Sequence, residues 1–349
     1  MAIYRIYPEK DTTILSEPNT AGVYGNAGLD EILEIRSYPD DDGIGRSSRI
    51  LIKFSDRDIN SALSTKVSGA YSASLHLYLA DGLQLPQEYE LEAHSIDTPW
   101  LQGTGKLGDS PANTTGVTWV AKEPGNNWTS PGCDFTDNSN SSSQIFNLLS
   151  NLDVDIDVSK YIKSFENGSI DNNGILLKFH DNQENELTSS INLKYFSSNT
   201  STIFPPYLEL KWDDSSYNST LDELSTDIAT VNIKNQKEKY IDSDIARFRL
   251  SARPKHPTRS FTTSSIYLTE SKLPENSYWG IKDEFSEEMI IDFDTKFTKI
   301  SADNKSSYFD VYMDTLQPER YYRLLVKTTL DGSTVVLDNK NVFKVVRHG

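Results

Sequence analysis

Cysteine, long apolar runs and basic residues are all scarce in this chain. Its 349 residues include one cysteine, Cys133, so no disulfide can form within the chain. Cys133 has Asp134 beside it, whereas a reactive thiolate needs basic neighbours, so we predict no chemical role for it. A chain without disulfides fits an intracellular folding site. No run of about 18 apolar residues occurs, so we predict no membrane span.

The shortage of positive charge limits the possible partners. Lys and Arg total 34 against 51 Asp and Glu, which gives a net charge of −17. Such a field repels nucleic acid and anionic membranes, so we predict that neither is a partner. The first residues, MAIYRIYP, lack the charged-then-apolar order of a signal peptide, so we predict none.

Recognisable catalytic motifs are also missing. The five histidines, at positions 76, 94, 180, 256 and 348, do not pair with one another or with Cys133 at metal-ligand spacing. The sequence has no phosphate-binding loop, nucleophile elbow or dinucleotide fingerprint. We therefore predict that the protein is not an enzyme. A hydrolase with paired carboxylates remains the last-ranked alternative, because acids are abundant and their distances in space are invisible here.

What the chain does contain is a series of short strand patterns separated by turns. Residues 72–79 alternate at period two, and residues 49–54, 89–96, 175–179, 191–196 and 207–212 also resemble strands. A polar break follows, and strand patterns resume at 229–233, 246–251, 265–268, 288–293, 307–313, 321–327, 334–338 and 343–346. We predict an all-β protein with two antiparallel β-sandwich domains and one or two short helices, divided as domain 1–213, linker 214–226 and domain 227–349.

A local motif refines the prediction for the second domain. Leu316, Pro318 and Tyr322 have the spacing of a tyrosine corner, in which the Tyr hydroxyl at a strand start bonds to upstream backbone. Tyr322 is therefore predicted to have a structural role. The second domain is expected to be an immunoglobulin- or fibronectin-like sandwich.

The first 210 residues or so resemble a known sandwich family. In order, the matching pieces are residues 28–35, 49–54 and 73–78, Trp100, Trp119, and residues 155–158, 173–177 and 206–210. Together they resemble the DNRLRE-type domain, which is also classed with carbohydrate-binding module family 96. The resemblance implies a jelly-roll-like sandwich in which Trp100 and Trp119 are core landmarks.

The C-terminal part is similar to another group. Residues 278–283, 290–294, 297–301 and 316–322 look like segments of virion proteins from T4-like tailed marine phages that infect cyanobacteria. This implies a non-enzymatic structural protein of the tail, neck, baseplate or fibre apparatus. Such a protein folds in the host cytoplasm, contacts other virion proteins, and is present as a homo-oligomer or in multiple copies. The alternatives are a carbohydrate-binding or host-surface recognition protein, or a capsid decoration protein.

Aromatic residues supply the candidate interface and ligand positions. Trp128 lies in the long polar stretch 102–145, where it could be an exposed platform for stacking a sugar or could pack over the end of the sandwich. Tyr278 and Trp279 are candidate interface anchors, because Tyr and Trp concentrate in interfaces.

A short acidic series is the weak candidate for a metal site. Asp153, Asp155 and Asp157 alternate, so a strand would place all three carboxylates on one face, where a Ca²⁺ ion could offset their repulsion. The glycine and the distal glutamate of a calcium loop are missing. A solvated face before a helix is the alternative, and no other cofactor is predicted.

Overall fold

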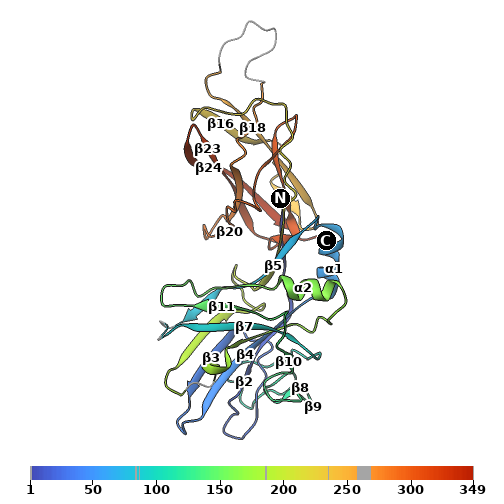
Figure 1. Cartoon of the computed structure of the whole chain (residues 1–349), viewed down its shortest axis with the longest axis vertical. Coiled ribbons are helices and arrows are strands. Elements are labelled where there is room, and N and C mark those ends of the chain that lie inside the picture. The colour runs from blue at the N-terminus through green and yellow to red at the C-terminus, as the bar shows by residue number, and fades with distance from the viewer. Residues whose placement is uncertain are drawn as a thin grey trace. The chain divides into compact units, whose positions relative to one another are not determined.

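The computed structural model describes residues 2–82, 85, 87–184, 187–234, 236–257 and 269–348. Almost all of its regular structure is β, and its strands form several antiparallel sheets, which confirms the predicted all-β sandwich class (Figure 1). No helix in these ranges is long and apolar enough to cross a membrane.

The chain divides into two compact units. The N-terminal sandwich comprises Ile6–Lys66 and Ser72–Glu209, and the immunoglobulin-like unit comprises Met1–Arg5, Val67–Tyr71 and Leu210–Gly349. Residues 214–226, predicted as a linker, belong to the second unit and are not a free connection. Tyr217 forms a parallel bridge with Ala302, and Leu224 is buried in the core of this unit. This packing is not evident from the polar composition of the segment, because it depends on one buried leucine and on backbone hydrogen bonds to the rest of the unit.

Two sheets and a small hairpin account for the strands up to residue 212. The larger sheet has the order β10 (Phe135–Thr136), β7 (Tyr89–Ile96), β13 (Ile175–Phe179), β4 (Gly45–Phe54), β3 (Ile32–Pro39), β14 (Ile191–Phe196), β6 (Leu79–Gly82), with β11 (Ser142–Phe146) on β7 and β2 (Pro8–Leu15) on β4. The smaller sheet has the order β1 (Ala2–Ile6), β15 (Tyr207–Trp212), β5 (Tyr71–Leu77), β12 (Val154–Asp157). The hairpin is β8 (Ala121–Glu123) with β9 (Asn126–Asn127).

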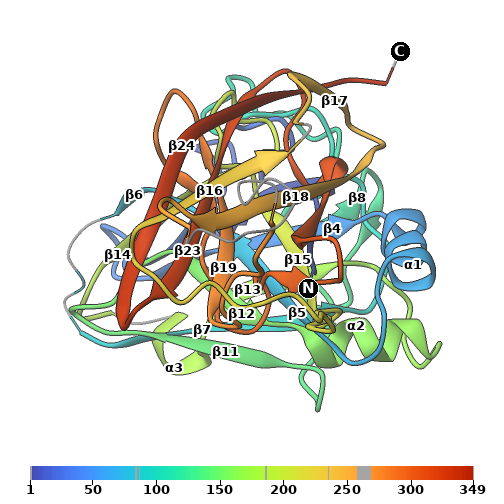
Figure 2. The same ribbon diagram turned by 90° about the horizontal axis from the view of Figure 1, so that it is seen from above.

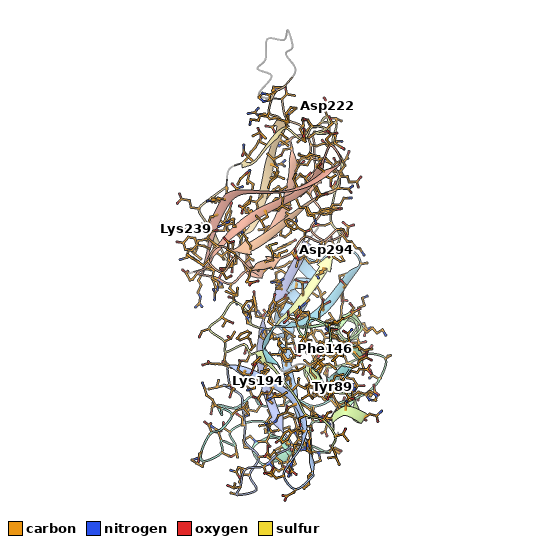
Figure 3. All side chains as sticks on the ribbon, turned by 90° about the vertical axis from the view of Figure 1, so that its left-hand side faces the viewer. Tyr89, Phe146, Lys194, Asp222, Lys239 and Asp294 are labelled. Atoms are coloured by element: carbon orange, nitrogen blue, oxygen red, sulfur yellow. The ribbon has the colours of Figure 1, made fainter. Side chains whose placement is uncertain are left out.

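Alternating burial explains why these segments are strands. In β5, Ala73, Leu75 and Leu77 are buried while the residues between them are partly exposed, as a half-buried strand requires. Phe146 of β11 is the cross-strand partner of Tyr89 of β7, and both rings are buried (Figure 3). Sequence alternation therefore fixes which side of each strand faces the core.

In the described part of the N-terminal sandwich, three short helices interrupt the strands. They are α1 (Asp56–Thr65), α2 (Ser159–Glu166) and α3 (Asp181–Glu184). Helix α1 was not predicted, although Ser55 occupies its N-cap and accepts a hydrogen bond from the Asp58 amide. Ser55 is a favoured N-cap residue, so this local pattern could have revealed the helix.

The immunoglobulin-like unit has the strand order of an immunoglobulin sandwich. One sheet is β16 (Ala229–Lys234), β18 (Ile245–Pro254), β22 (Ser307–Tyr312), β21 (Ser301–Ala302), and the other is β17 (Lys239–Ile241), β24 (Ser333–Val346), β23 (Tyr321–Leu330), β19 (Ser277–Asp283), β20 (Met289–Ile291). These orders match A-B-E-D and A′-G-F-C-C′, with β17 parallel to β24 (Figure 2). A 3₁₀ turn, η2 (Met313–Thr315), follows β22.

Two differences from the expected strands have physical causes. Strand β19 was not predicted, because its interior glycine, Gly280, weakens a strand pattern. A Cβ there would lie 3.0 Å from the Phe293 ring and 3.2 Å from the Ile291 carbonyl oxygen, so any larger residue would displace the neighbouring segment. The predicted strands 334–338 and 343–346 form the single long strand β24. The predicted strand 265–268 lies outside the described residues.

Candidate functional site

Trp128 is a core residue and not an exposed platform. Its side chain is 5% exposed, and its indole N–H donates a 3.0 Å hydrogen bond to the Thr118 carbonyl. It belongs to a buried cluster with Trp100, Val117, Cys133, Ile14, Ile96, Leu51 and Leu176. The polar neighbours of Trp128 in the sequence suggested exposure, but its loop folds back over the sheet. The sugar-stacking alternative for Trp128 is therefore wrong.

Trp100 and Trp119 have the structural roles predicted for them. Trp100 is buried, and its indole donates a 2.9 Å bond to the Asn173 carbonyl. Trp119 is partly buried against the same cluster, and the Arg49 guanidinium lies 5.0 Å from its ring centre. Burial raises the pKa of the Cys133 thiol far above its usual range, which keeps this group protonated.

Trp279 also lies in a core, so it is not an interface anchor. It is 1% exposed, and its ring stacks on Phe309 with centroids 5.3 Å apart and planes 8° apart. A buried tryptophan on strand C is a hallmark of the immunoglobulin fold. Tyr278 is on the opposite face of β19, because successive side chains of a strand alternate, and it is half-buried.

The three aspartates of the weak calcium prediction do not converge on one point. Asp153 accepts bonds from the Leu79 amide at 2.8 Å and the Asn151 side chain at 2.9 Å. Asp157 accepts the Ser159 amide at 2.8 Å, and Asp155 is exposed on β12. In the described ranges, no group of three or more His, Cys, Asp or Glu residues is placed to hold a metal ion.

The net negative charge of the chain lies almost entirely in one of the two units. The N-terminal sandwich has 13 Lys and Arg against 29 Asp and Glu, a net charge of −16, whereas the immunoglobulin-like unit has 21 against 22, a net charge of −1. Repulsion from polyanions is therefore a property of the N-terminal sandwich. The second unit can approach partners of either sign.

A polar cleft of about 490 Å³ is a candidate ligand site in the N-terminal sandwich. Its walls come from three separated segments: the β2–β3 connection, β3, and the start of the long loop. The polar lining side chains are Glu17, Asn19, Asn26, Glu34, Arg36, Lys106, Asp109 and Asn113, with Leu15, Val23 and Leu107 among the apolar ones.

The buried side chain of Asn26 holds the cleft wall in place. Its amide nitrogen donates to the carbonyls of Gln102 at 2.7 Å and Val117 at 2.8 Å. Its amide oxygen accepts the Gly28 and Gly105 amides at 3.2 and 2.9 Å. All four bonds of the side chain are used, so the first part of the long loop is pinned to the β2–β3 connection. The cleft is thus preformed.

Charged groups at one side of the cleft are already paired with one another. Arg36 donates to Glu17 at 3.3 Å and lies 4.0 Å from Glu34. The Tyr38 hydroxyl also donates to Glu17, and burial raises the pKa of Tyr38 to about 12. Arg36 and Tyr38 also line an adjoining cavity of about 300 Å³ with Asn192. Carboxylate and amide groups can bind hydroxyl groups, and none of the described lining residues of the larger cleft is aromatic.

An exposed aromatic pair is the second candidate site, on the immunoglobulin-like unit. Phe285, in the turn between β19 and β20, is 79% exposed, and Tyr321 at the start of β23 is 41% exposed. Their ring centroids are 5.8 Å apart in an edge-to-face arrangement with planes 88° apart. This geometry is favourable for aromatic pairs. The two rings form one exposed apolar feature.

The turn that carries Phe285 is held by a buried acid. Asp283 is 2% exposed, and one of its oxygens accepts the amides of Phe285 and Ser286, both at 2.9 Å. The Glu284 amide donates to the Tyr321 carbonyl at 3.0 Å, which ties the turn to β23. Phe285 is therefore displayed by a constrained backbone. The sequence analysis missed it, although a lone phenylalanine among acids, DEFSEE, was a visible signal.

Comparisons with known proteins place the chain in no family. No protein-family model matches the sequence, and no curated protein matches it. Among solved structures, the binding domain of botulinum neurotoxin serotype D/C (VPI 5993) has 9% identity over 96% of this chain and 68% of that chain, with a TM-score of 0.19. A likeness at that TM-score carries no functional argument.

Proposed function

We propose that this chain is a non-enzymatic structural component of a tailed phage virion, in its tail, neck, baseplate or fibre apparatus, acting through protein–protein interfaces. The observation that carries the proposal is the rigid display of Phe285 against Tyr321 on the immunoglobulin-like unit. The resemblance of residues 278–322 to phage virion proteins directs the proposal to a particle.

An exposed aromatic pair on a fixed turn has the properties of an interface anchor. Aromatic residues are enriched at the centres of interfaces, where a few side chains carry most of the binding free energy. A constrained backbone lowers the entropy lost on binding. The near-neutral charge of this unit adds little long-range repulsion of its own at such an interface.

Mass spectrometry of purified phage particles tests this proposal. Particles separated from lysate on a density gradient should contain the chain at a fixed ratio to the major capsid protein. Host ribosomal proteins serve as the contamination control. Absence of the chain from gradient-purified particles would overturn the proposal.

The preformed cleft favours a second candidate function, glycan binding in host-surface recognition. Its carboxylate and amide groups suit the hydroxyls of a neutral oligosaccharide, whereas the charge of −16 on this unit disfavours acidic polymers. The lining is polar, so recognition would depend on hydrogen bonds.

Calorimetric titration with neutral and acidic oligosaccharides tests this second candidate. Binding of a neutral glycan should weaken at least about tenfold in Glu34→Gln, since losing one charged hydrogen bond costs about 1.5–3 kcal/mol. Glu123→Gln, exposed and outside the cleft lining, is the matched control. Equal binding by both variants, or preference for acidic glycans, would exclude the cleft as the site.

A further inference from the structure

A second exposed feature lies on the other sheet of the immunoglobulin-like unit. We call it the arginine surface, and it consists of Ile245 and Arg247 of β18 with Tyr308 and Asp310 of β22. Ile245 is 62% exposed, and the Arg247 side chain is 51% exposed. The aromatic surface, defined by Phe285 and Tyr321 with their rim of Glu284, Glu287 and Glu319, lies on the sheet that contains β19 and β23.

Arg247 is held in one orientation. Its guanidinium donates two hydrogen bonds to Asp310, at 2.8 and 2.7 Å, and lies 4.5 Å from the centre of the Tyr308 ring. A planar guanidinium paired on one edge and stacked on a ring retains further donors for a partner carboxylate. The exposed Ile245 supplies an apolar contact beside it in the same strand.

The exposed charges of the two surfaces are opposite in sign. At the aromatic surface, the carboxylates are outermost: Glu287 is 65% and Glu319 53% exposed at the side chain. The cations that pair with them are nearer the sheet, with Arg323 9% and Lys344 21% exposed. At the arginine surface, the order is reversed, because Arg247 is about twice as exposed as Asp310, at 51% against 26%.

We propose that copies of this chain associate head to tail, with the aromatic surface of one immunoglobulin-like unit docked on the arginine surface of the next. This rests on the proposed function, since it names the partner of the aromatic surface as a second copy. Phe285 and Tyr321 contact Ile245 and Tyr308, and Glu287 and Glu319 approach Arg247. The pairing joins apolar centres and places opposite charges together.

The two surfaces belong to different sheets of one sandwich (Figures 1 and 2). Each copy therefore offers one donor surface and one acceptor surface, and the contact is heterologous. Heterologous contacts build rings when the rotation closes and filaments when it does not. Both outcomes give a multi-copy assembly, which is the form expected of a structural virion component.

Sedimentation velocity of the full chain tests the proposal over a concentration range of about 1–200 µM, which brackets the Kd expected of a small, partly polar interface. The wild type is expected to show concentration-dependent mass above the monomer at an ionic strength of about 0.15 M, which largely screens the repulsion between copies of net charge −17. Phe285→Ala and Arg247→Glu are each expected to raise the apparent Kd at least about tenfold, as loss of a hot-spot residue does. Lys255→Glu, an exposed cation just beyond the far end of β18 and eight residues along the chain from Arg247, is the matched charge control.

Mixing the two variants separates this arrangement from a symmetric one. Phe285→Ala retains an intact arginine surface, and Arg247→Glu retains an intact aromatic surface. An equimolar mixture is therefore expected to form mainly a 1:1 pair, whereas each variant alone associates at least about tenfold more weakly than the wild type. A symmetric contact through the aromatic surface would leave Arg247→Glu self-associating.

Three results would each overturn the proposal. The first is a wild type that is still monomeric at about 200 µM, where even a weak interface should be populated. The others are unchanged association of Arg247→Glu and the absence of pairing between the two variants in the mixture. Circular dichroism of each variant confirms that the fold is retained. Failure here is distinct from failure of the proposed function. A chain found in particles but monomeric in solution loses only the head-to-tail contact, whereas a self-associating chain absent from particles loses the virion assignment.

Discussion

The Tyr322 hydroxyl donates a 2.8 Å hydrogen bond to the Gln317 carbonyl, five residues upstream. The ring is buried, and it packs against Phe343 of β24 with centroids 5.9 Å apart. The bond joins the start of β23 to the turn after η2, at the corner between the two sheets of the immunoglobulin-like unit. This is the tyrosine corner predicted from the spacing of Leu316, Pro318 and Tyr322.

Replacing Tyr322 with phenylalanine should weaken this corner without changing its packing. The variant loses one hydrogen bond and leaves the partly buried Gln317 carbonyl less satisfied, so its free energy of unfolding should fall by about 1–2 kcal/mol. Urea denaturation measures the change. Tyr321→Phe, at the exposed neighbouring position, is the control and should stay within about 0.5 kcal/mol of the wild type. Equal effects of the two substitutions would contradict the role given to Tyr322.

Trp128→Ala should act on stability. The side chain is buried among Trp100, Val117 and Cys133, so its removal should cost about 3–5 kcal/mol of unfolding free energy in the N-terminal sandwich. Leu101→Ala, just before the same long loop but 48% exposed, should be nearly neutral. Denaturation monitored by tryptophan fluorescence distinguishes the two. A folded, fully stable Trp128→Ala protein that had lost glycan binding would restore the platform interpretation.

Asp11 makes the stability of the N-terminal sandwich depend on pH. Burial raises the pKa of Asp11 from 3.8 to about 6, although the carboxylate accepts two bonds from Ser198 at 2.7 Å. The folded protein therefore binds this proton more tightly than the unfolded chain. Its stabilising contribution is complete below pH 3.8 and is lost as the pH rises through about 6.

The substitution Asp11→Asn should abolish this loss of stability of the N-terminal sandwich at rising pH. The difference in unfolding free energy between the variant and the wild type should shift in favour of the variant between about pH 4 and about pH 7. Urea midpoints at the two pH values measure the shift. Asp41→Asn, at an exposed position, should follow the wild-type profile. Parallel profiles for Asp11→Asn and wild type would show that the carboxyl of Asp11 titrates normally.

Local patterns in the sequence predicted the parts of the fold that depend on nearby residues. The tyrosine corner spans seven positions, and the alternation in β5 spans seven, so both are visible without knowledge of the fold. The all-β fold class and the sandwich architecture follow from many such local patterns. The N-cap at Ser55 was equally local and was overlooked.

Burial of a particular aromatic residue depends on distant partners and was predicted less well. Trp279 is covered by Phe309, thirty residues away, and Trp128 by residues from β2, β4 and β13. The cleft combines residues 15–36 with residues 106–113, and only the fold brings them together. The exposure of Phe285 was missed for a different reason. Its acidic neighbours in the turn are a local signal, but Phe285 was treated as an ordinary loop residue and was not considered as a site residue.

Incorporation of Phe285→Ala into phage particles tests the central claim most directly. Purified particles from a phage encoding the variant should be compared by quantitative mass spectrometry with particles from the wild type. Leu149→Ala, also at an exposed apolar position but in the N-terminal sandwich, is the control. We expect the wild type and the control to be present at equal levels and Phe285→Ala to be depleted at least about tenfold. Equal incorporation of all three chains, or their absence from every particle, would contradict the account.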